Sequence, residues 1–283
     1  MKTISIEKIT EAVSELTIQA CYELPDDVLG ALEKAKAAET SSRAKNVLAQ
    51  LIENAEIAKT QRIPLCQDTG LSVVFIEKGT EITFEPAGCD LFNAVNLGVE
   101  IGYDKGSLRK SVVAEPMNLR RNTGTNTPCI IHYSQNNGDK LKISVMAKGG
   151  GCENKSQFKM FNPTESKDNI CRWIAAVAKE AGASACPPFV VGVGIGGNFE
   201  KCCLLSKKSL LKKIGTKHKD PFYASMEDEI LRQINATGIG PAGLGGTTTA
   251  LSVHIETAAC HIASLPVAVN IECHSHRHKS ITL

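Results

Sequence analysis

Three cysteines stand in sequence surroundings that suggest metal chemistry rather than packing. Cys66 lies in Pro-Leu-Cys-Gln-Asp-Thr-Gly, which places a thiol, an amide and a carboxylate side by side just ahead of an apolar run. Cys186 lies in Ala-Cys-Pro-Pro, and Cys273 lies in Ile-Glu-Cys-His. We therefore take these three thiols together as candidate metal ligands.

The spacing of these cysteines bears on which metal centre they would hold. Structural zinc sites usually draw ligands from closely spaced pairs, and none of the three has another cysteine two to four residues away. Widely separated thiolates suit an iron–sulfur cluster wrapped by a whole domain better. Three protein thiolates leave one iron open, and an open iron acts as a Lewis acid on a substrate oxygen.

Two other classes of protein stay open at this point. One is a structural zinc protein. The other is a cluster-based electron carrier or sensor, whose cluster is usually fully ligated by protein. A fourth thiolate would favour the carrier, and Cys152 is the best candidate for it.

The composition excludes several further classes. The chain has 283 residues, of which 42% are hydrophobic and 22% charged, as is ordinary for a globular protein. With 32 basic against 30 acidic residues, no large field favours nucleic acid or an anionic membrane as a partner. No apolar run reaches the roughly 20 residues of a membrane span, and the N-terminal residues lack a signal-peptide core. We expect a cytoplasmic protein with no membrane and no nucleic-acid partner.

The other cysteines are expected to serve packing. The chain has eleven cysteines, and the odd number argues against a disulfide framework. In a reducing compartment most cysteines behave as small buried apolar residues. We expect the following, which have apolar neighbours, in the core: Cys21, Cys89, Cys129, Cys171 and Cys260. The histidines that follow Cys273 are expected to be exposed.

Hydrophobic periodicity predicts a mixture of helices and short strands. The expected helices cover residues 5–21, a stretch beginning at 25, a stretch beginning at 41, 87–102, 165–182, 198–214 and 221–236. The expected strands cover 71–76, 128–133, 140–146, 189–197, 250–256 and 267–271. Residues 136–139 read as the turn of a hairpin between 128–133 and 140–146. We expect an α+β fold with helices around small, largely antiparallel sheets. It forms a single cluster-binding domain over 1–283, with 1–60 as a helical N-terminal layer.

Glycine-rich segments adjoin the candidate ligands. Residues 148–156 contain three consecutive glycines, which let the backbone approach a ligand and offer amides to an anion. Residues 189–197 have glycine at alternate positions of an apolar run, typical of close backbone approach within a strand. This run lacks the spacing of a dinucleotide-binding fingerprint, and the chain has no phosphate-binding loop ending in Gly-Lys-Ser/Thr. Nucleotide binding is therefore excluded.

Taken together, the motifs resemble those of the class I fumarate hydratase family. Those that carry the resemblance lie at residues 64–70, 148–151, 185–188, 243–248, 254–257, 260–266 and Cys273. The chain is most similar to the α subunit of the two-subunit form, a type shared with L-tartrate dehydratase. The match runs from near residue 5 to the C-terminus.

The resemblance implies roles for seven residues. Those matching ligands of a [4Fe-4S] cluster are Cys66, Cys186 and Cys273. Those matching substrate-binding residues are Gln67, Asp68, Arg109 and Gly150.

Arg109 would hold a substrate carboxylate, for which a bidentate fork is suited; Arg120 and Arg121 lie nearby in the sequence. Asp68 is the candidate catalytic residue in this chain. The resemblance places the base that removes the proton on a β subunit. Cys152 stands where the family often has serine, and we expect a packing variant; the alternative is a reactive thiol near the cluster.

The resemblance also implies an activity and a partner. The family reaction is the reversible hydration of fumarate to L-malate, with the open iron polarising the C2 hydroxyl. We therefore expect a fumarate hydratase α subunit that is active only with a β subunit, in an α2β2-type assembly. An L-tartrate dehydratase α subunit is the alternative, because both substrates are small dicarboxylates.

Overall fold

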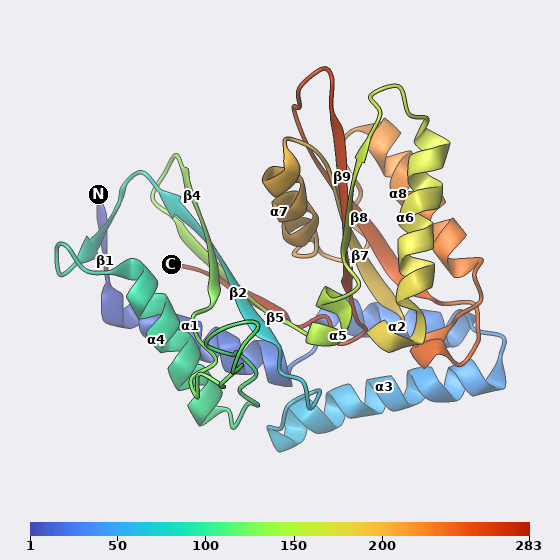
Figure 1. Cartoon of the computed structure of the whole chain (residues 1–283). Coiled ribbons are helices and arrows are strands. Elements are labelled where there is room, and N and C mark those ends of the chain that lie inside the picture. The colour runs from blue at the N-terminus through green and yellow to red at the C-terminus, as the bar shows by residue number, and fades with distance from the viewer. The chain divides into compact units, whose positions relative to one another are not determined.

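The computed structural model describes all 283 residues, Met1–Leu283, and the chain forms two compact units (Figure 1). The first unit comprises Met1–Pro25, Ala55–Gly150 and Arg277–Leu283. The second comprises Asp26–Asn54 and Gly151–His276. Each unit combines helices with one small four-stranded sheet in which antiparallel pairings predominate, so the expected α+β fold is confirmed. The single domain over 1–283 stays a prediction.

The first unit is built on a sheet with strand order β10-β5-β2-β4. Its strands are β2 (Leu71–Gly79), β4 (Ile130–Asn136), β5 (Leu141–Lys148) and β10 (His278–Thr282). A separate parallel pair consists of β1 (Lys2–Ser5) and β3 (Ile82–Glu85). The helices that complete the unit are α1 (Ile6–Tyr22) and α4 (Leu91–Lys105). Helix α1 packs against α4, β5 and β10, and their apolar side chains form one core.

The predicted hairpin between the strands at 130 and 141 is wrong. Strand β2 lies between them, paired in parallel with β4 and antiparallel with β5. The connection from β4 to β5 therefore crosses the end of β2, where Gly79 N donates to Lys140 O at 2.8 Å. A side chain at Gly79 would meet Gly138 O at 2.2 Å, so the glycine permits this close crossing. Local turn signals correctly indicated a turn, but they do not reveal a strand inserted from elsewhere in the chain.

The second unit is built on a sheet with strand order β6-β9-β7-β8. Its strands are β6 (Gln157–Phe161), β7 (Phe189–Gly196), β8 (Ala250–Ala258) and β9 (Leu265–Glu272). Its longer helices are α2 (Asp26–Ala38), α6 (Lys167–Ala181), α7 (Phe199–Ser209) and α8 (Pro221–Asn235). Helix α7 packs on one face of the sheet, and α6 and α8 on the other (Figure 1). Helix α3 (Ser42–Gln61) and the short α5 (Gly150–Glu153) each contain the boundary between the two units.

The alternating glycines of β7 allow α7 to lie directly against the sheet. A β-carbon at Gly192 would lie 2.2 Å from Ser206 O, and one at Gly194 would lie 2.1 Å from Cys202 O. The sequence-based expectation of close backbone approach here is confirmed.

The predicted helices are all present, with ends shifted by a few residues, and the structure adds β1, β3, β6 and β10. Helix starts have clear local causes: the side chains of Asp90, Ser166 and Asn198 each accept a backbone N–H of the following turn. The added strands are four or five residues long, too short for a clear alternation of apolar and polar residues.

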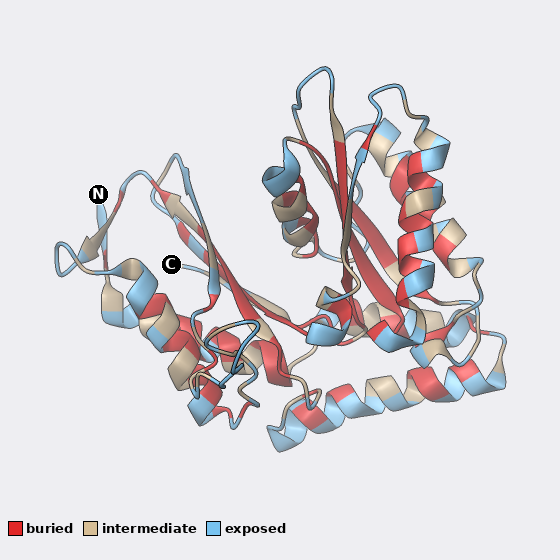
Figure 2. Ribbon diagram, in the orientation of Figure 1, coloured by how far each residue is buried: buried red, intermediate tan, exposed pale blue.

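Burial corrects part of the cysteine assignment (Figure 2). Cys21, Cys129 and Cys171 are buried as expected, whereas Cys260 is exposed and Cys89 is half-buried. Cys260 lies in the loop between β8 and β9, where apolar sequence neighbours do not create a core.

None of the helices has the length and apolar character that crossing a bilayer requires.

Candidate metal and substrate site

The turn that carries Cys66 is held rigidly in the first unit. It connects the end of α3 to β2, and its backbone carbonyls are bonded by side chains from distant segments. Tyr103 OH donates to Thr69 O at 2.7 Å and to Gly70 O at 3.0 Å. Asn126 Nδ2 donates to Gly70 O at 3.2 Å. These buried donors position the turn, and nothing in the local sequence around Tyr103 or Asn126 indicates that role.

The carboxylate of Asp68 links this turn to the glycine-rich segment. Its Oδ1 accepts from Gly70 N at 3.0 Å, and its Oδ2 accepts from Gly150 N at 2.9 Å. The structure thus brings together two predicted site residues, Asp68 and Gly150, that are 82 positions apart. The Arg277 guanidinium donates to the backbone carbonyl of Asp68, which is a third hydrogen bond to this residue.

Arg109 lies beside the other predicted substrate residue of the turn. Its Nη1 donates to Gln67 Oε1 at 3.0 Å, and its backbone carbonyl accepts from Thr69 Oγ1 at 2.8 Å. Both long side chains are exposed. Arg120 instead donates to the backbone of its own loop, at Pro116 O. Of Arg109 and Arg120, Arg109 is therefore the arginine that hydrogen-bonds to Gln67.

Cys186 and Cys273 meet at one end of the sheet in the second unit. Strands β7 and β9 are antiparallel, with Val190 opposite Glu272. The segment that leads into β7, with Cys186 three residues before Phe189, and Cys273 directly after β9 must therefore fall at the same sheet end. His274 N donates to Cys186 O at 3.2 Å, and His274 Nδ1 lies 3.1 Å from the same oxygen. Cys186 has a left-handed backbone, with φ of 53°, and its side chain is exposed.

The surroundings of Cys273 differ from the sequence-based expectation. Ser275 Oγ lies 3.0 Å from Cys273 Sγ, and His276 N donates to Cys273 O at 3.1 Å. The predicted exposure of the C-terminal histidines is wrong for His276, which is 1% exposed, and Arg277 beside it is also buried. His276 lies in a turn that its hydrogen bond to Cys273 O closes, and the chain continues from this turn into β10.

A further glycine-rich loop, residues 238–249, is held by a carboxylate that the sequence did not single out. Glu39 Oε2 accepts from Thr247 N at 2.8 Å and from Thr247 Oγ1 at 2.9 Å, while Oε1 accepts from Thr40 N and Ser41 N. Burial by itself would raise the pKa of Glu39. The hydrogen bonds from Ser41, Thr247 and Thr40 outweigh that effect and lower the pKa. The loop in turn contacts the Cys186 segment, where Ala242 N donates to Pro187 O at 2.8 Å.

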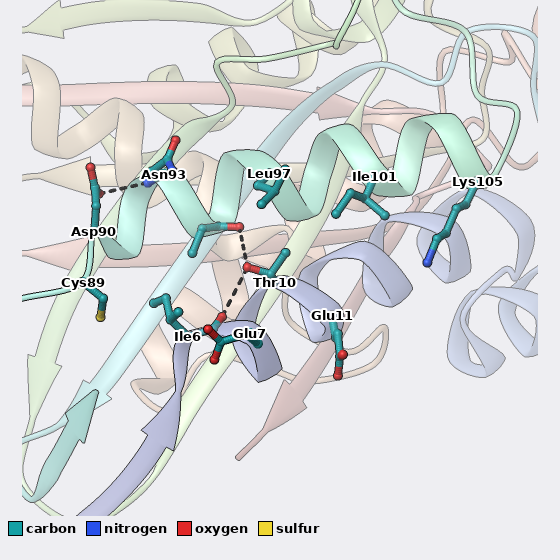
Figure 3. A pocket seen from close by; sticks show the side chains of 11 residues that line it. Ile6, Glu7, Thr10, Glu11, Cys89, Asp90, Asn93, Leu97, Ile101 and Lys105 are labelled. Carbon is teal, nitrogen blue, oxygen red and sulfur yellow. Dashed lines mark hydrogen bonds between the residues drawn. The ribbon is translucent and has the colours of Figure 1, made fainter. Parts of the chain in front are cut away.

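A cavity of about 480 Å³ in the first unit contains none of the predicted site residues (Figure 3). It lies along α1 and α4, where Thr10 Oγ1 hydrogen-bonds to both Ile6 O and Ala94 O at 3.2 Å. Its lining combines apolar and acidic side chains with Thr10 and Asn93, and has Lys105 at one end and Cys89 at the other. It is therefore separate from the candidate site.

The donors in the structure suit an iron–sulfur cluster. Iron–sulfur clusters are held chiefly by cysteine thiolates, and Cys66, Cys186 and Cys273 all lie on turns rather than inside regular elements. Ser275 can donate to the sulfur of Cys273 at 3.0 Å, and hydrogen bonds to ligand sulfurs tune such centres. The donor type of each thiol thus fits such a group, with Cys66 in the first unit and Cys186 and Cys273 in the second.

Comparison with known proteins agrees with this chemistry. The family model for fumarate hydratase (fumerase) matches residues 10–282. The chain is 41% identical over 274 residues to the putative L(+)-tartrate dehydratase subunit alpha of Methanocaldococcus jannaschii, covering 95% of each chain. It is 34% identical over 278 residues to the L(+)-tartrate dehydratase subunit alpha of Escherichia coli strain UTI89, covering 98% of this chain and 91% of that one. The chain belongs to the fumarate hydratase family and is a hydro-lyase.

Proposed function

We propose that this chain is the α subunit of an iron–sulfur fumarate hydratase, which interconverts fumarate and L-malate together with a β subunit. The observation that carries the proposal is the contact set in the first unit. There Asp68 is bonded to Gly150 and Gln67 to Arg109, immediately beside Cys66. A cation, an amide and a carboxylate next to a thiol suit the binding of a small dicarboxylate at a metal centre.

We propose that Cys66, Cys186 and Cys273 hold a [4Fe-4S] cluster. When bound, such a cluster supplies a Lewis-acidic iron for the substrate hydroxyl. The Arg109 guanidinium would bind a substrate carboxylate through paired N–H donors and stabilise the negative charge that develops on it in the transition state. Gln67, on the same turn, orients the arginine.

Two backbone N–H groups, from Gly70 and Gly150, donate to the two carboxyl oxygens of Asp68 and fix its orientation. We propose that it positions the Gly150 backbone and contacts substrate. The base that removes the C3 proton is expected on the β subunit.

The second candidate function is L-tartrate dehydration. It is favoured by the names of the relatives, which are tartrate dehydratase α subunits at 41% and 34% identity. L-Tartrate and L-malate carry the same two terminal carboxylates, so Arg109 serves either substrate equally well.

We propose that the chain acts in the cytoplasm, in an α2β2-type assembly, because three thiols that hold iron must stay reduced.

Activity measurements on the chain co-expressed with a β subunit test the proposal. We expect turnover of L-malate or L-tartrate by the pair and none by this chain alone. Arg109→Lys should raise KM more than it lowers kcat, because the lysine keeps the charge and loses the bidentate fork. Arg120→Lys is the matched control and should leave both constants unchanged. Turnover by this chain alone, or equal effects of the two substitutions, would contradict the proposal.

Anaerobic reconstitution tests the ligands separately from activity. The wild-type chain should take up iron and sulfide and, after mild oxidation, show a [3Fe–4S] EPR signal that disappears on adding ferrous iron. Cys66→Ser, Cys186→Ser and Cys273→Ser should each abolish that signal, whereas Cys203→Ser, a half-buried cysteine of α7, should retain it. Retention of the signal in any of the three ligand variants would remove that cysteine from the site.

A further inference from the structure

Two thiols and a carboxylate form a buried group in the second unit. It consists of Cys152, Glu272 and Cys273, which are 4%, 1% and 7% exposed. Their ligand atoms all lie within 4.8 Å of one another. The Cys152 and Cys273 thiols each lie 3.8 Å from the same oxygen, Glu272 Oε1.

These separations are close to those around a tetrahedral zinc ion. Zn–S bonds of about 2.3 Å and Zn–O bonds of about 2.0–2.2 Å place neighbouring sulfur and oxygen ligands about 3.6 Å apart. Both sulfur–oxygen distances in the group are 3.8 Å, so an ion would draw these pairs together by only a few tenths of an ångström. The two sulfurs, which lie within 4.8 Å of each other, would have to come to about 3.8 Å. Two cysteines and a carboxylate are also a donor type that zinc accepts, and buried charges of this kind are stabilised by metal coordination.

The group is assembled by tertiary structure from two parts of the chain. Cys152 lies in α5, directly after the glycine run, and Glu272 and Cys273 lie at the end of β9. Cys152 is 120 residues from Glu272. The short α5 therefore brings a third metal-binding side chain to the Glu272–Cys273 pair, where the family often has serine.

We propose that Cys152, Glu272 and Cys273 form a binding site for a soft divalent cation of the Zn²⁺ type in the chain that lacks its iron–sulfur cluster. The site goes beyond the proposed function and shares only Cys273 with the proposed cluster. A zinc ion there occupies the thiolate of Cys273, so zinc and the cluster compete for this residue. Zinc uptake releases the protons of both thiols, since only thiolates bind the metal.

The test uses the full chain prepared without iron or sulfide under anaerobic conditions. Zn²⁺ affinity is measured by competition with a chromophoric chelator, and Co²⁺ serves as a spectroscopic probe through its thiolate charge-transfer absorption. We expect one ion per chain and protection of two thiols from a thiol-reactive dye. Cys152→Ser removes a ligand, so it should weaken zinc binding by at least the roughly 100-fold at the upper end of the range for loss of a group that only supports a ligand, and it should halve the charge-transfer intensity. Cys203→Ser should change neither measurement.

Two further variants separate this site from the cluster. Cys66→Ser should bind zinc as the wild type does while losing the iron–sulfur EPR signal. Glu272→Gln keeps the size of the side chain and should weaken zinc binding while both thiols remain, which covers the case that Cys152→Ser folds poorly. Zinc added before reconstitution should slow cluster formation in the wild type but not in Cys152→Ser.

The outcomes are distinct for the two proposals. Absence of zinc binding, wild-type affinity in Cys152→Ser, or loss of zinc binding in Cys66→Ser would each overturn the zinc site. The last result would mean that zinc occupies the three predicted cluster cysteines instead. If no iron–sulfur cluster forms in the wild type but zinc binding follows the expected pattern, the proposed function fails and the zinc site stands.

Discussion

Replacing Gly70 by alanine should destabilise the chain through two effects that a second glycine separates. Gly70 has φ of +78°, a left-handed conformation that costs an alanine roughly 1–2 kcal/mol. In addition, a β-carbon at Gly70 would lie 2.7 Å from Lys148 O and 2.8 Å from Lys148 C. These are backbone atoms of β5 that cannot swing aside, and overpacking of this kind typically costs about 1–3 kcal/mol.

Gly88 is the matched control. It has φ of +77°, and nothing lies within 4 Å of its β-carbon position. Gly88→Ala should therefore show the backbone term alone, and Gly70→Ala should be less stable than Gly88→Ala by about 2 kcal/mol. At about 2–4 °C per kcal/mol for chains of this size, the melting temperatures of the two variants should differ by roughly 4–8 °C.

Thermal unfolding of the full-length chain, followed by circular dichroism, measures this difference. Because Gly70 ends the turn that carries Cys66 and Asp68, iron content after anaerobic reconstitution should also fall in Gly70→Ala and not in Gly88→Ala. Equal melting temperatures for the two variants would refute the argument, since they would show that the close approach of β5 carries no energetic weight.

Three further changes test the second unit. Gly192→Ala should lower the free energy of unfolding by at least about 3 kcal/mol, the upper part of the overpacking range, because its β-carbon would lie 2.2 Å from Ser206 O. The control is Gly30→Ala in helix α2, where nothing lies within 4 Å of the added β-carbon; it should raise the free energy of unfolding by about 0.8–1 kcal/mol. Denaturant titration of both variants measures the two changes. Glu39→Gln should cost about 2–3 kcal/mol in the same titration, the scale of a hydrogen bond to a charged group. Because the folded-state pKa of Glu39 is lowered, its contribution is present above its unfolded pKa and is lost as the pH falls through the folded value, so equal wild-type and variant acid profiles would contradict this. Burial, and secondarily the charge of Lys212, lowers the pKa of His254 to about 4. Protonation of this histidine in the unfolded chain should therefore remove up to about 3 kcal/mol of stability as the pH falls from about 6.5 to 4. In His254→Gln this dependence of the unfolding free energy on pH should disappear, and an unchanged dependence would disprove the argument.

Much of the chemistry was readable from the sequence because it depends on residue type and local spacing. The motif around Cys66 places a thiol, an amide and a carboxylate together by covalent connection alone. Helix positions follow from apolar periodicity and from capping residues such as Asp90, which act within a few residues. The alternating glycines of β7 likewise indicated a close approach of other backbone to this strand, because a residue without a β-carbon leaves room for it.

The arrangement of these pieces depended on contacts that no local pattern specifies. Turn residues at 136–139 predicted a hairpin, yet β4 and β5 both pair with β2 and β5 also pairs with β10, because strand pairing is decided by the whole sheet. The support of Gly70 by Tyr103 and Asn126 joins segments more than 30 residues apart. Sequence alone also did not indicate that Cys152, a buried residue as its packing interpretation predicts, lies beside Glu272 and Cys273, and it wrongly predicted that His276 is exposed.

Residue types and local spacing establish the chemical groups that this chain offers: three thiols in unusual turns, a carboxylate beside one of them, and helices and strands that follow local periodicity. Which of those groups meet depends on the three-dimensional fold. It joined Asp68 to Gly150 and Arg109 to Gln67, and it placed Cys152 beside Glu272 and Cys273. The physical reason is that residue type sets what a side chain can bind. Which side chains share a site depends instead on burial and long-range pairing, which involve residues far apart in the chain.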